Sequence, residues 1–218
     1  MKTYYTGWRV RHYNQHWRTY TRKTLAAVMA MIDEARLRHV PEQQGRPPRV
    51  LDIACGTGVL LRQLIERLPD MEAYGVDASA DMLAQAQGVL KNQPHVYLDL
   101  VEIDASETAG LHYAPQTFDL ITCMNALHDM PDPVVLLSRL RQLLSPGGQL
   151  VLEDFARRAP PFPWFVVEWL AKHIEGSYVH DYTLAEMHSL CEQAGLRVVR
   201  AQAFPIDWLW HGWVLRAD

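Results

Sequence analysis

Two glycines and one carboxylate have the types and spacing needed to bind a nucleoside. Gly56 and Gly58 follow the apolar run at residues 50–54. Glycine lets the chain turn sharply there, with no side chain in the way of a ligand. Asp77 follows the next apolar run, about 20 residues after the glycines, where a carboxylate can accept hydrogen bonds from both ribose hydroxyls. The alternative is that Asp77 caps the helix expected next, although Ser79 would serve as well.

Polar residues also follow the third and fourth apolar runs. Asp104 and Ala105 come after residues 96–103, where the carboxylate can accept a hydrogen bond from the exocyclic amine of adenine and the Ala105 amide can donate to the ring. A solvated loop aspartate is the alternative there. Asn125 and His128 follow the fourth run. Open α/β sheets bind ligands at the carboxyl ends of their parallel strands, which is where these residues are expected to lie.

The apolar runs themselves predict a parallel sheet, because short runs that alternate with helical segments are typical of βαβ units. The expected parallel strands are residues 50–54, 73–76, 96–103, 118–124 and 149–155, with helices at 59–68, 80–90 and 131–144. A helix at 184–194, with a capping box formed by Thr183 and Glu186, precedes an antiparallel strand pair at 197–203 and 208–216.

The segments that flank this alternation are expected to add helices to it. Leu25, Val28 and Ile32 recur at helical spacing and predict one helix over residues 17–38. Residues 41–48 (PEQQGRPP) read as a linker, since they are rich in breakers. An aromatic helix is expected over residues 164–174.

Class I S-adenosylmethionine-dependent methyltransferases carry similar motifs in the same order. In this chain the motifs read DIACGTG at residues 52–58, DAS at 77–79 with Met82 after it, Asp104-Ala105, and LSPGG at 144–148. The resemblance covers roughly residues 45–155. It is greatest to the small-molecule group that contains the ubiquinone and menaquinone biosynthesis methyltransferases.

The resemblance implies a single Rossmann-like α/β domain over residues 1–218. Its seven-stranded sheet would be mostly parallel, with an antiparallel last strand, helices on both faces and an N-terminal helical cap. The cap would be residues 1–45, the cofactor-binding core 46–155, an acceptor-pocket insertion 156–183, and the last helix and strand pair 184–218.

The resemblance also implies S-adenosylmethionine as cofactor, S-adenosylhomocysteine as product, and no metal. Asp52 and the turn from Gly56 to Gly58 would face the methionine part. Asp77 would hold the ribose, and the Asn125 carbonyl would accept from the amino group. Ala78 and Met82 would pack against the adenine ring, and Asp104 and Ala105 would bind its polar edge. Tyr13 and Trp17 belong to the N-terminal segment that would close over the cofactor.

Methyl transfer from a sulfonium is an in-line displacement, so a base is needed only where the acceptor must lose a proton. An ordinary pKa near 6.5 suits His128 to that role for a phenol or carboxylic acid, and a packing role is the alternative. The residues expected to contact a small acceptor are Trp17, His128, Trp164, Tyr178 and His180.

The aromatic residues at 161–169 favour an apolar or aromatic acceptor, with core packing as the alternative. We expect O-methylation. C- or N-methylation of a quinone-like or amine substrate is one alternative, and a non-catalytic partner protein that only binds the cofactor is another.

Composition argues against several other classes of protein. A net charge of −4 and a pI near 6.2 disfavour a nucleic-acid substrate. The three cysteines form no CxxC pair, so neither a zinc site nor a disulfide framework is indicated. No membrane span is expected. The cysteine pattern favours a reducing compartment, so we expect a cytoplasmic protein, and we expect a monomer or homodimer. A nicotinamide enzyme would need a third glycine where Leu61 stands.

Overall fold

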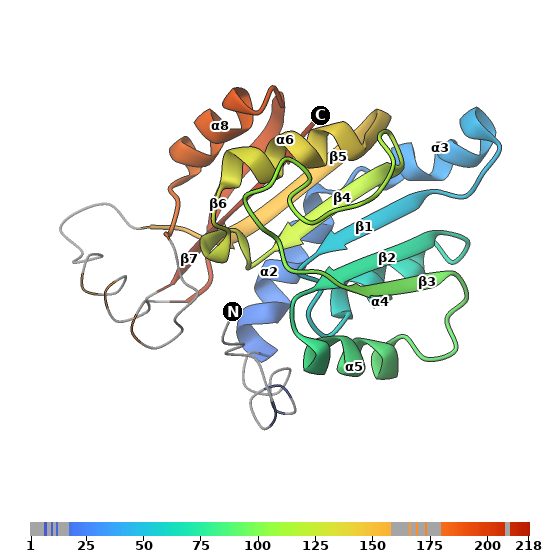
Figure 1. Ribbon diagram of the computed structural model, residues 1–218, viewed down its shortest axis with the longest axis horizontal. Coiled ribbons are helices and arrows are strands. Elements are labelled where there is room, and N and C mark those ends of the chain that lie inside the picture. Colours follow the sequence, from blue (N-terminus) through green and yellow to red (C-terminus); the bar gives the residue numbers. More distant parts are fainter. Residues whose placement is uncertain are drawn as a thin grey trace.

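A seven-stranded sheet forms the centre of the molecule, in the order β3-β2-β1-β4-β5-β7-β6 (Figure 1). The computed structural model describes residues 18–157, 180–207 and 210–218, together with 7, 10, 12, 166, 169 and 173. The strands are β1 (Arg49–Ile53), β2 (Glu72–Asp77), β3 (Val96–Leu100), β4 (Phe118–Met124), β5 (Leu144–Phe155), β6 (Val198–Pro205) and β7 (His211–Ala217).

Only β7 runs against its neighbours in this sheet. β1 pairs in parallel with β2 and β4, β2 with β3, and β4 with β5, whereas β7 is antiparallel to both β5 and β6. The Rossmann-like class I fold with an antiparallel last strand is therefore confirmed. Parallel pairing places the carboxyl ends of β1, β2 and β4 at one edge of the sheet, where the predicted ligand residues follow them.

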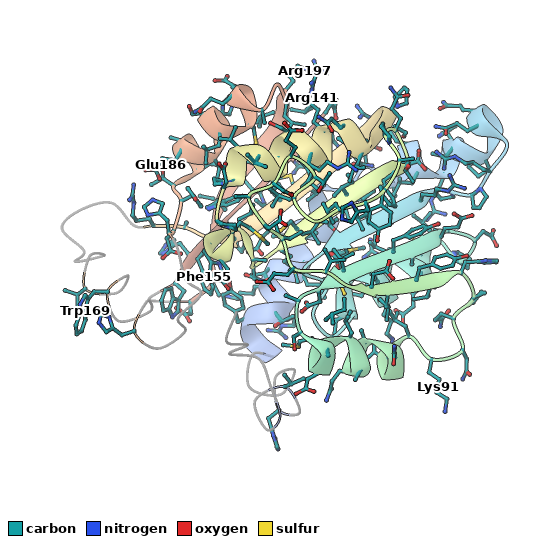
Figure 2. The ribbon with its side chains drawn as sticks, in the orientation of Figure 1. Lys91, Arg141, Phe155, Trp169, Glu186 and Arg197 are labelled. Atoms are coloured by element: carbon teal, nitrogen blue, oxygen red, sulfur yellow. The ribbon has the colours of Figure 1, made fainter. Side chains whose placement is uncertain are left out.

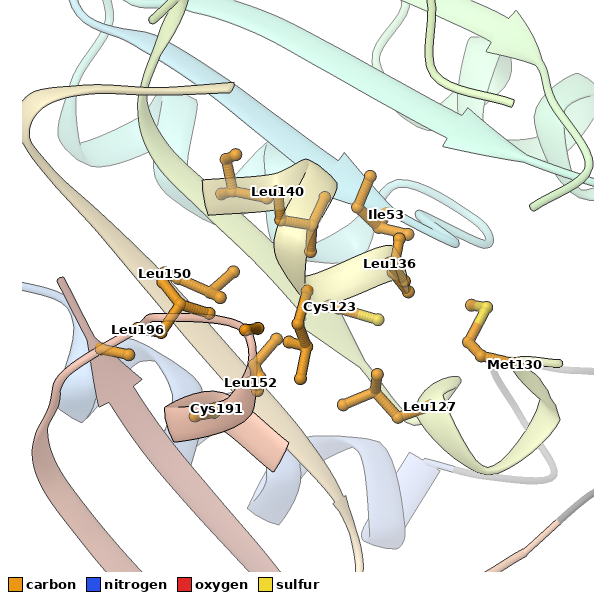
Figure 3. Packing of buried hydrophobic residues seen from close by; sticks show 14 of the residues in the cluster. Ile53, Cys123, Leu127, Met130, Leu136, Leu140, Leu150, Leu152, Cys191 and Leu196 are labelled. Atoms are coloured by element: carbon orange, nitrogen blue, oxygen red, sulfur yellow. The ribbon is translucent and has the colours of Figure 1, made fainter. Parts of the chain in front are cut away.

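Helices cover both faces of the sheet, because side chains alternate between the faces along each strand. Leu51 and Ile53 of β1 pack toward α6 (Pro133–Leu143) and α8 (Leu184–Gln193), in the cluster that Figure 3 shows. Val50 packs on the other face. That face is covered by α2 (Arg18–Met31), α3 (Glu34–Gln44), α4 (Val59–Arg67) and α5 (Ala80–Val89).

The prediction for the N-terminal helices is wrong in two respects. One helix was expected over residues 17–38, but the chain forms α2 and α3, with a break at Ile32 and Asp33. The break occurs because the Asp33 side chain accepts a hydrogen bond from Arg36 N at 3.3 Å and so caps α3. The expected linker from residue 41 is partly helical, since α3 continues through Pro41 and ends before Gly45 at φ 66°.

Several strand boundaries also differ from expectation. β3 ends at Leu100 and not at residue 103, and β5 begins at Leu144 and not at residue 149. Residues 101–117 form no helix, and Arg139 of α6 donates to the carbonyls of Leu111 and Tyr113 in this segment, at 2.8 and 2.6 Å. The helix expected at residues 164–174 lies almost wholly outside the described residues. Within the described segments, no helix has the length and apolarity to span a membrane.

Candidate cofactor and acceptor site

A hollow of about 50 Å³ opens at the carboxyl ends of β1 and β4, beneath α2. Its walls include Asp52, Gly56 and Asn125, three of the residues predicted to bind the cofactor. Thr21 of α2 and Met124 of β4 complete the side nearest the helix. The fold therefore brings together residues that are far apart in the sequence, because their strands are neighbours in the sheet.

Left-handed backbone conformations surround this hollow. Ala54 and Asn125 follow β1 and β4 with φ of 54° and 53°, a region that L residues other than asparagine seldom adopt. Gly56 and Gly58 have φ of 54° and 74° in the same turn. Such strain is concentrated at functional sites, where the surrounding structure holds it in place.

Gly58 is needed for its small size as well as for its φ. A Cβ atom there would lie 3.1 Å from the Cβ of Ala86 in α5 and 3.0 Å from Cδ1 of Leu90, the residue that follows this helix. Gly58 is also the N-cap of α4, with no side-chain cap. The first N–H groups of that helix therefore point toward the strand ends, a position suited to an anionic group such as a carboxylate.

Asp52 is a buried acid on β1, 3% exposed. Its Oδ1 accepts a hydrogen bond from Thr122 Oγ1 at 2.6 Å. Burial raises the pKa of Asp52 to about 7, and the Thr122 hydrogen bond only partly offsets that rise. An ammonium group in the hollow would favour the ionised form of Asp52. Thr122 was not predicted, because nothing in its sequence context separates it from the apolar run around it.

Asp77 ends β2 and holds the glycine turn. Its Oδ2 accepts from Gly56 N and its Oδ1 from Ser79 N, each at 2.8 Å, while burial raises its pKa. Ser79 is the N-cap of α5, accepting from Met82 N at 3.2 Å, so the capping alternative applies to Ser79 and not to Asp77. A carboxylate offers about four acceptor positions, so the Asp77 carboxylate retains capacity for two hydroxyls.

The residues predicted to surround adenine are only partly brought together. Met82 is buried in α5, and Ala78 precedes that helix. Asp104 and Ala105 are exposed. Asp104 Oδ1 accepts from Ser106 N and Oγ at 2.9 and 2.5 Å, hydrogen bonds that hold its pKa below the usual range. This is the geometry of a loop aspartate, and an adenine contact at Asp104 stays a prediction.

His128 lies in η1 (Leu127–Asp129), just past β4, and is held by Asp154 of β5. Asp154 Oδ1 lies 2.7 Å from His128 Nδ1, and Oδ2 accepts from His128 N at 2.9 Å. Asp129 Oδ2 lies 3.9 Å from Nε2. Burial alone would lower the pKa of His128, but the Asp154 carboxylate, helped by Asp129 and Asp181, raises it to about 10.

Asp154 was missed by the sequence analysis. The signal was available, since residues 153 and 154 are two acids inside an otherwise apolar strand. Acids are seldom fully buried unless they are paired, so their presence in such a run indicates a partner or a ligand. The partner of Asp154 is His128.

Three aromatic rings form a wall beside His128. Phe155, labelled in Figure 2, lies at the end of β5. Its ring centroid is 4.8 Å from that of Tyr20 of α2, 5.3 Å from that of Trp210 and 5.8 Å from that of His128. The Tyr20 hydroxyl donates a hydrogen bond to Asn125 Oδ1 and so ties α2 to the strand end. Tyr20 was not predicted, because its helical spacing resembles that of any surface residue of α2.

The other predicted site residues are either near this wall or outside the described part. His180 N donates to the His128 carbonyl at 3.1 Å, and the His180 ring lies 4.9 Å from that of Tyr182. Four predicted residues lie outside the described residues: Tyr13, Trp17, Trp164 and Tyr178. Among the residues that are described, no group of three or more His, Cys, Asp or Glu has a metal-binding arrangement.

Comparisons with known proteins show the family and the fold of this chain. The family model described as "Methyltransferase domain" matches residues 30–201. The ubiquinone biosynthesis O-methyltransferase of Aeromonas salmonicida is 29% identical over 174 residues, which are 77% of this chain and 71% of that protein. The protein of the same name from Aromatoleum aromaticum is 30% identical over 158 residues, 68% of this chain and 63% of that protein.

A solved structure shares the fold. An S-adenosylmethionine-dependent methyltransferase from Mesorhizobium loti superposes with a TM-score of 0.66 and 22% identity. The superposition covers 88% of this chain and 95% of that one. The described sheet and the helices on its two faces are therefore the architecture of a known group of proteins.

Proposed function

The chain belongs to the methyltransferase domain family of class I S-adenosylmethionine-dependent enzymes, and on that premise we propose that it methylates a small acceptor with an apolar or aromatic body. O-methylation is favoured, because the similar proteins from Aeromonas and Aromatoleum are named O-methyltransferases.

The observation that carries this proposal is the paired geometry of Asp77 and the glycine turn. Asp77 holds Gly56 N at 2.8 Å and keeps capacity for two ribose hydroxyls. The methionine part would then lie in the hollow beside Asp52, with its amino group toward the Asn125 carbonyl. The sulfonium methyl would point toward the wall formed by Phe155, Tyr20 and Trp210.

We assign His128 the role of base toward the acceptor oxygen. Asp154 holds Nδ1 at 2.7 Å and so fixes the ring, and we assign proton exchange with the acceptor to the other ring nitrogen, Nε2. A pKa of about 10 matches that of a phenol, but it leaves little neutral imidazole near pH 7. The rate should therefore rise with pH up to about 10, because only the neutral imidazole can accept a proton.

An acceptor screen scored by release of S-adenosylhomocysteine tests the proposal. Phenols, carboxylic acids and amines on matched ring systems would be offered at several pH values. We expect turnover with at least one oxygen acceptor, and a loss of roughly 10²-fold or more in kcat/KM for His128→Asn. Full activity of His128→Asn, with an unchanged pH profile, would show that His128 is not the base.

Asp77→Ala is the cofactor-site control in this screen, and it should lose turnover with every acceptor. Should the wild-type protein bind the cofactor but release no S-adenosylhomocysteine with any acceptor, it would be a binding protein and not an enzyme.

A further inference from the structure

Glu153 is a buried carboxyl group that the proposed reaction does not use. It lies on β5 and is 0% exposed, and neither of its carboxyl oxygens has a hydrogen-bond partner among the described residues. The Asn125 N–H donates to its main-chain carbonyl at 2.9 Å. Buried polar groups are nearly always hydrogen-bonded, so this carboxyl requires an explanation.

The strand pattern places Glu153 on the face of the sheet that α2 covers. Glu153 is two residues from Val151, which packs in the cluster that contains Leu25 and Val28 of α2. In register it lies between Met124 of β4 and Val214 of β7. Since Met124 lines the hollow with Asp52, the Glu153 carboxyl is one strand away from the expected methionine part of the cofactor.

The basic groups on neighbouring elements have other partners. Lys23 of α2 donates to the Ile206 carbonyl at 2.5 Å, and Arg216 of β7 donates to the Met31 carbonyl at 3.3 Å. His128 is held by Asp154, on the opposite face of β5. None of these described cations forms an ion pair with Glu153.

The acids nearby make an ionised Glu153 less favourable still. Burial raises the pKa of Glu153 well above its usual range and the Asp154 carboxylate adds to the rise, whereas His128 and the nearby Asn125 N–H oppose it. Asp52, on the same face, is a second acid that burial affects in this way, with a pKa of about 7. Tyr20 of α2 donates its hydroxyl to Asn125 Oδ1, and Arg22 of the same helix is exposed to solvent.

We propose that Glu153 recognises the positive charge of the sulfonium. It gives up its proton to solvent when S-adenosylmethionine binds, and it regains a proton when the neutral thioether S-adenosylhomocysteine is left in the site. An opposite charge in a poorly hydrated site favours the ionised carboxyl, and the loss of that charge reverses the effect. Glu153 thereby favours binding of the substrate form over the product form. This inference rests on the proposed function.

The two ligands allow Glu153 to be separated from Asp52. Both ligands carry the same amino and carboxylate groups, so proton exchange at Asp52 is common to them. Only S-adenosylmethionine carries the sulfonium charge. The difference in proton release between the two ligands therefore reports the group that responds to the sulfonium.

Calorimetric titration at pH 7 in two buffers of different ionisation enthalpy counts the protons released by each ligand. For the wild-type protein we expect more protons released with S-adenosylmethionine than with S-adenosylhomocysteine, by up to one. In Glu153→Gln this difference should vanish, and the preference for S-adenosylmethionine should fall about tenfold. Asp119→Asn is the matched control, a buried acid at the other end of β4 that Arg46 and Ser145 bind, and it should keep the difference.

Equal proton release by both ligands in the wild-type protein would overturn the inference without any variant, even if Glu153→Gln did not fold. Retention of the difference by a folded Glu153→Gln would overturn it too. If neither ligand bound the wild-type protein, the proposed function would fail, and this inference would fail with it.

Discussion

Four acids lie at the carboxyl ends of the strands, and each is held differently. Asp77 accepts from two backbone N–H groups, Asp52 from the Thr122 hydroxyl, and Asp154 from the N–H and ring of His128. Glu153 has no such partner among the described residues. The four acids therefore differ in their hydrogen-bond partners, and the role of each can be tested by an isosteric amide.

Asp77→Asn should weaken cofactor binding. An amide at this position keeps the shape but loses charge-assisted hydrogen bonds to the ribose, which are worth about 1.5–3 kcal/mol, or roughly 10- to 150-fold in Kd. Titration calorimetry with S-adenosylhomocysteine measures the change. Asp70→Asn, an exposed acid just before β2, is the control and should bind as the wild-type protein does. Equal affinities for both variants would remove Asp77 from the site.

The His128–Asp154 pair should make stability depend on pH. The pKa of His128 rises from its ordinary 6.5 to about 10 in the folded protein, so its stabilisation is complete below pH 6.5 and is lost as pH rises through 10. The free energy of unfolding should fall by about 2–4 kcal/mol over that range. Urea unfolding at a series of pH values measures it. His128→Asn should give a flatter profile, and a wild-type profile no steeper than that of the variant would contradict the assignment.

At the scale of elements, β4 and the helices that follow β1 were predicted closely, whereas the N-terminal helix and several strand boundaries were not. β4 occupies residues 118–124 as expected, because a short, mostly apolar run that includes β-branched residues favours a buried strand. The break between α2 and α3 was not expected, since it depends on whether the Asp33 side chain turns back to Arg36 N. Helical periodicity does not report such a local choice.

The residues of the candidate site were likewise predicted only in part. Asp52, Gly56 and Asn125 were found because they follow predicted strands, and the sheet brings them to one hollow. Tyr20 was missed because no local pattern encodes its pairing with Asn125 across the molecule. The two adjacent acids at 153 and 154 indicated a buried partner, but they did not identify it as His128.

The turn between β1 and α4 requires Gly58. Gly58→Ala would place a Cβ 3.0 Å from Leu90 Cδ1 at a φ of 74°, so we expect a loss of about 1–3 kcal/mol in unfolding free energy. Gly88→Ala is the matched control, because that residue lies inside α5 with nothing within 4 Å of an added Cβ. This control should be neutral or gain up to about 1 kcal/mol. Denaturant unfolding of both variants tests the pair, and equal effects would contradict it.

At the scale of the molecule, α2 connects the centre of the sheet to the end formed by β7 and β6. Tyr20 reaches Asn125 after β4, and Lys23 reaches the Ile206 carbonyl in the connection between β6 and β7. A ligand that lies between α2 and the strand ends is therefore expected to bind the folded state, in which these two hydrogen bonds are formed. Such a ligand stabilises the whole fold by linkage.

Saturation with cofactor should raise the melting temperature. At about 100 times Kd, a ligand that binds only the native state adds about 2.7 kcal/mol, which is roughly 5–11 °C for a chain of this size. Thermal unfolding with and without S-adenosylhomocysteine measures the shift, and Asp77→Asn at the same ligand concentration should shift less. A wild-type protein with no shift at saturating ligand would contradict binding to the native fold.

The most direct measurement is a crystal structure of this chain with S-adenosylhomocysteine. We predict that the Asp77 carboxylate accepts hydrogen bonds from the ribose hydroxyls, and that the homocysteine part lies in the hollow beside Asp52 and Asn125. A nucleoside bound elsewhere, or an Asp77 side chain turned away from the ribose, would contradict the account.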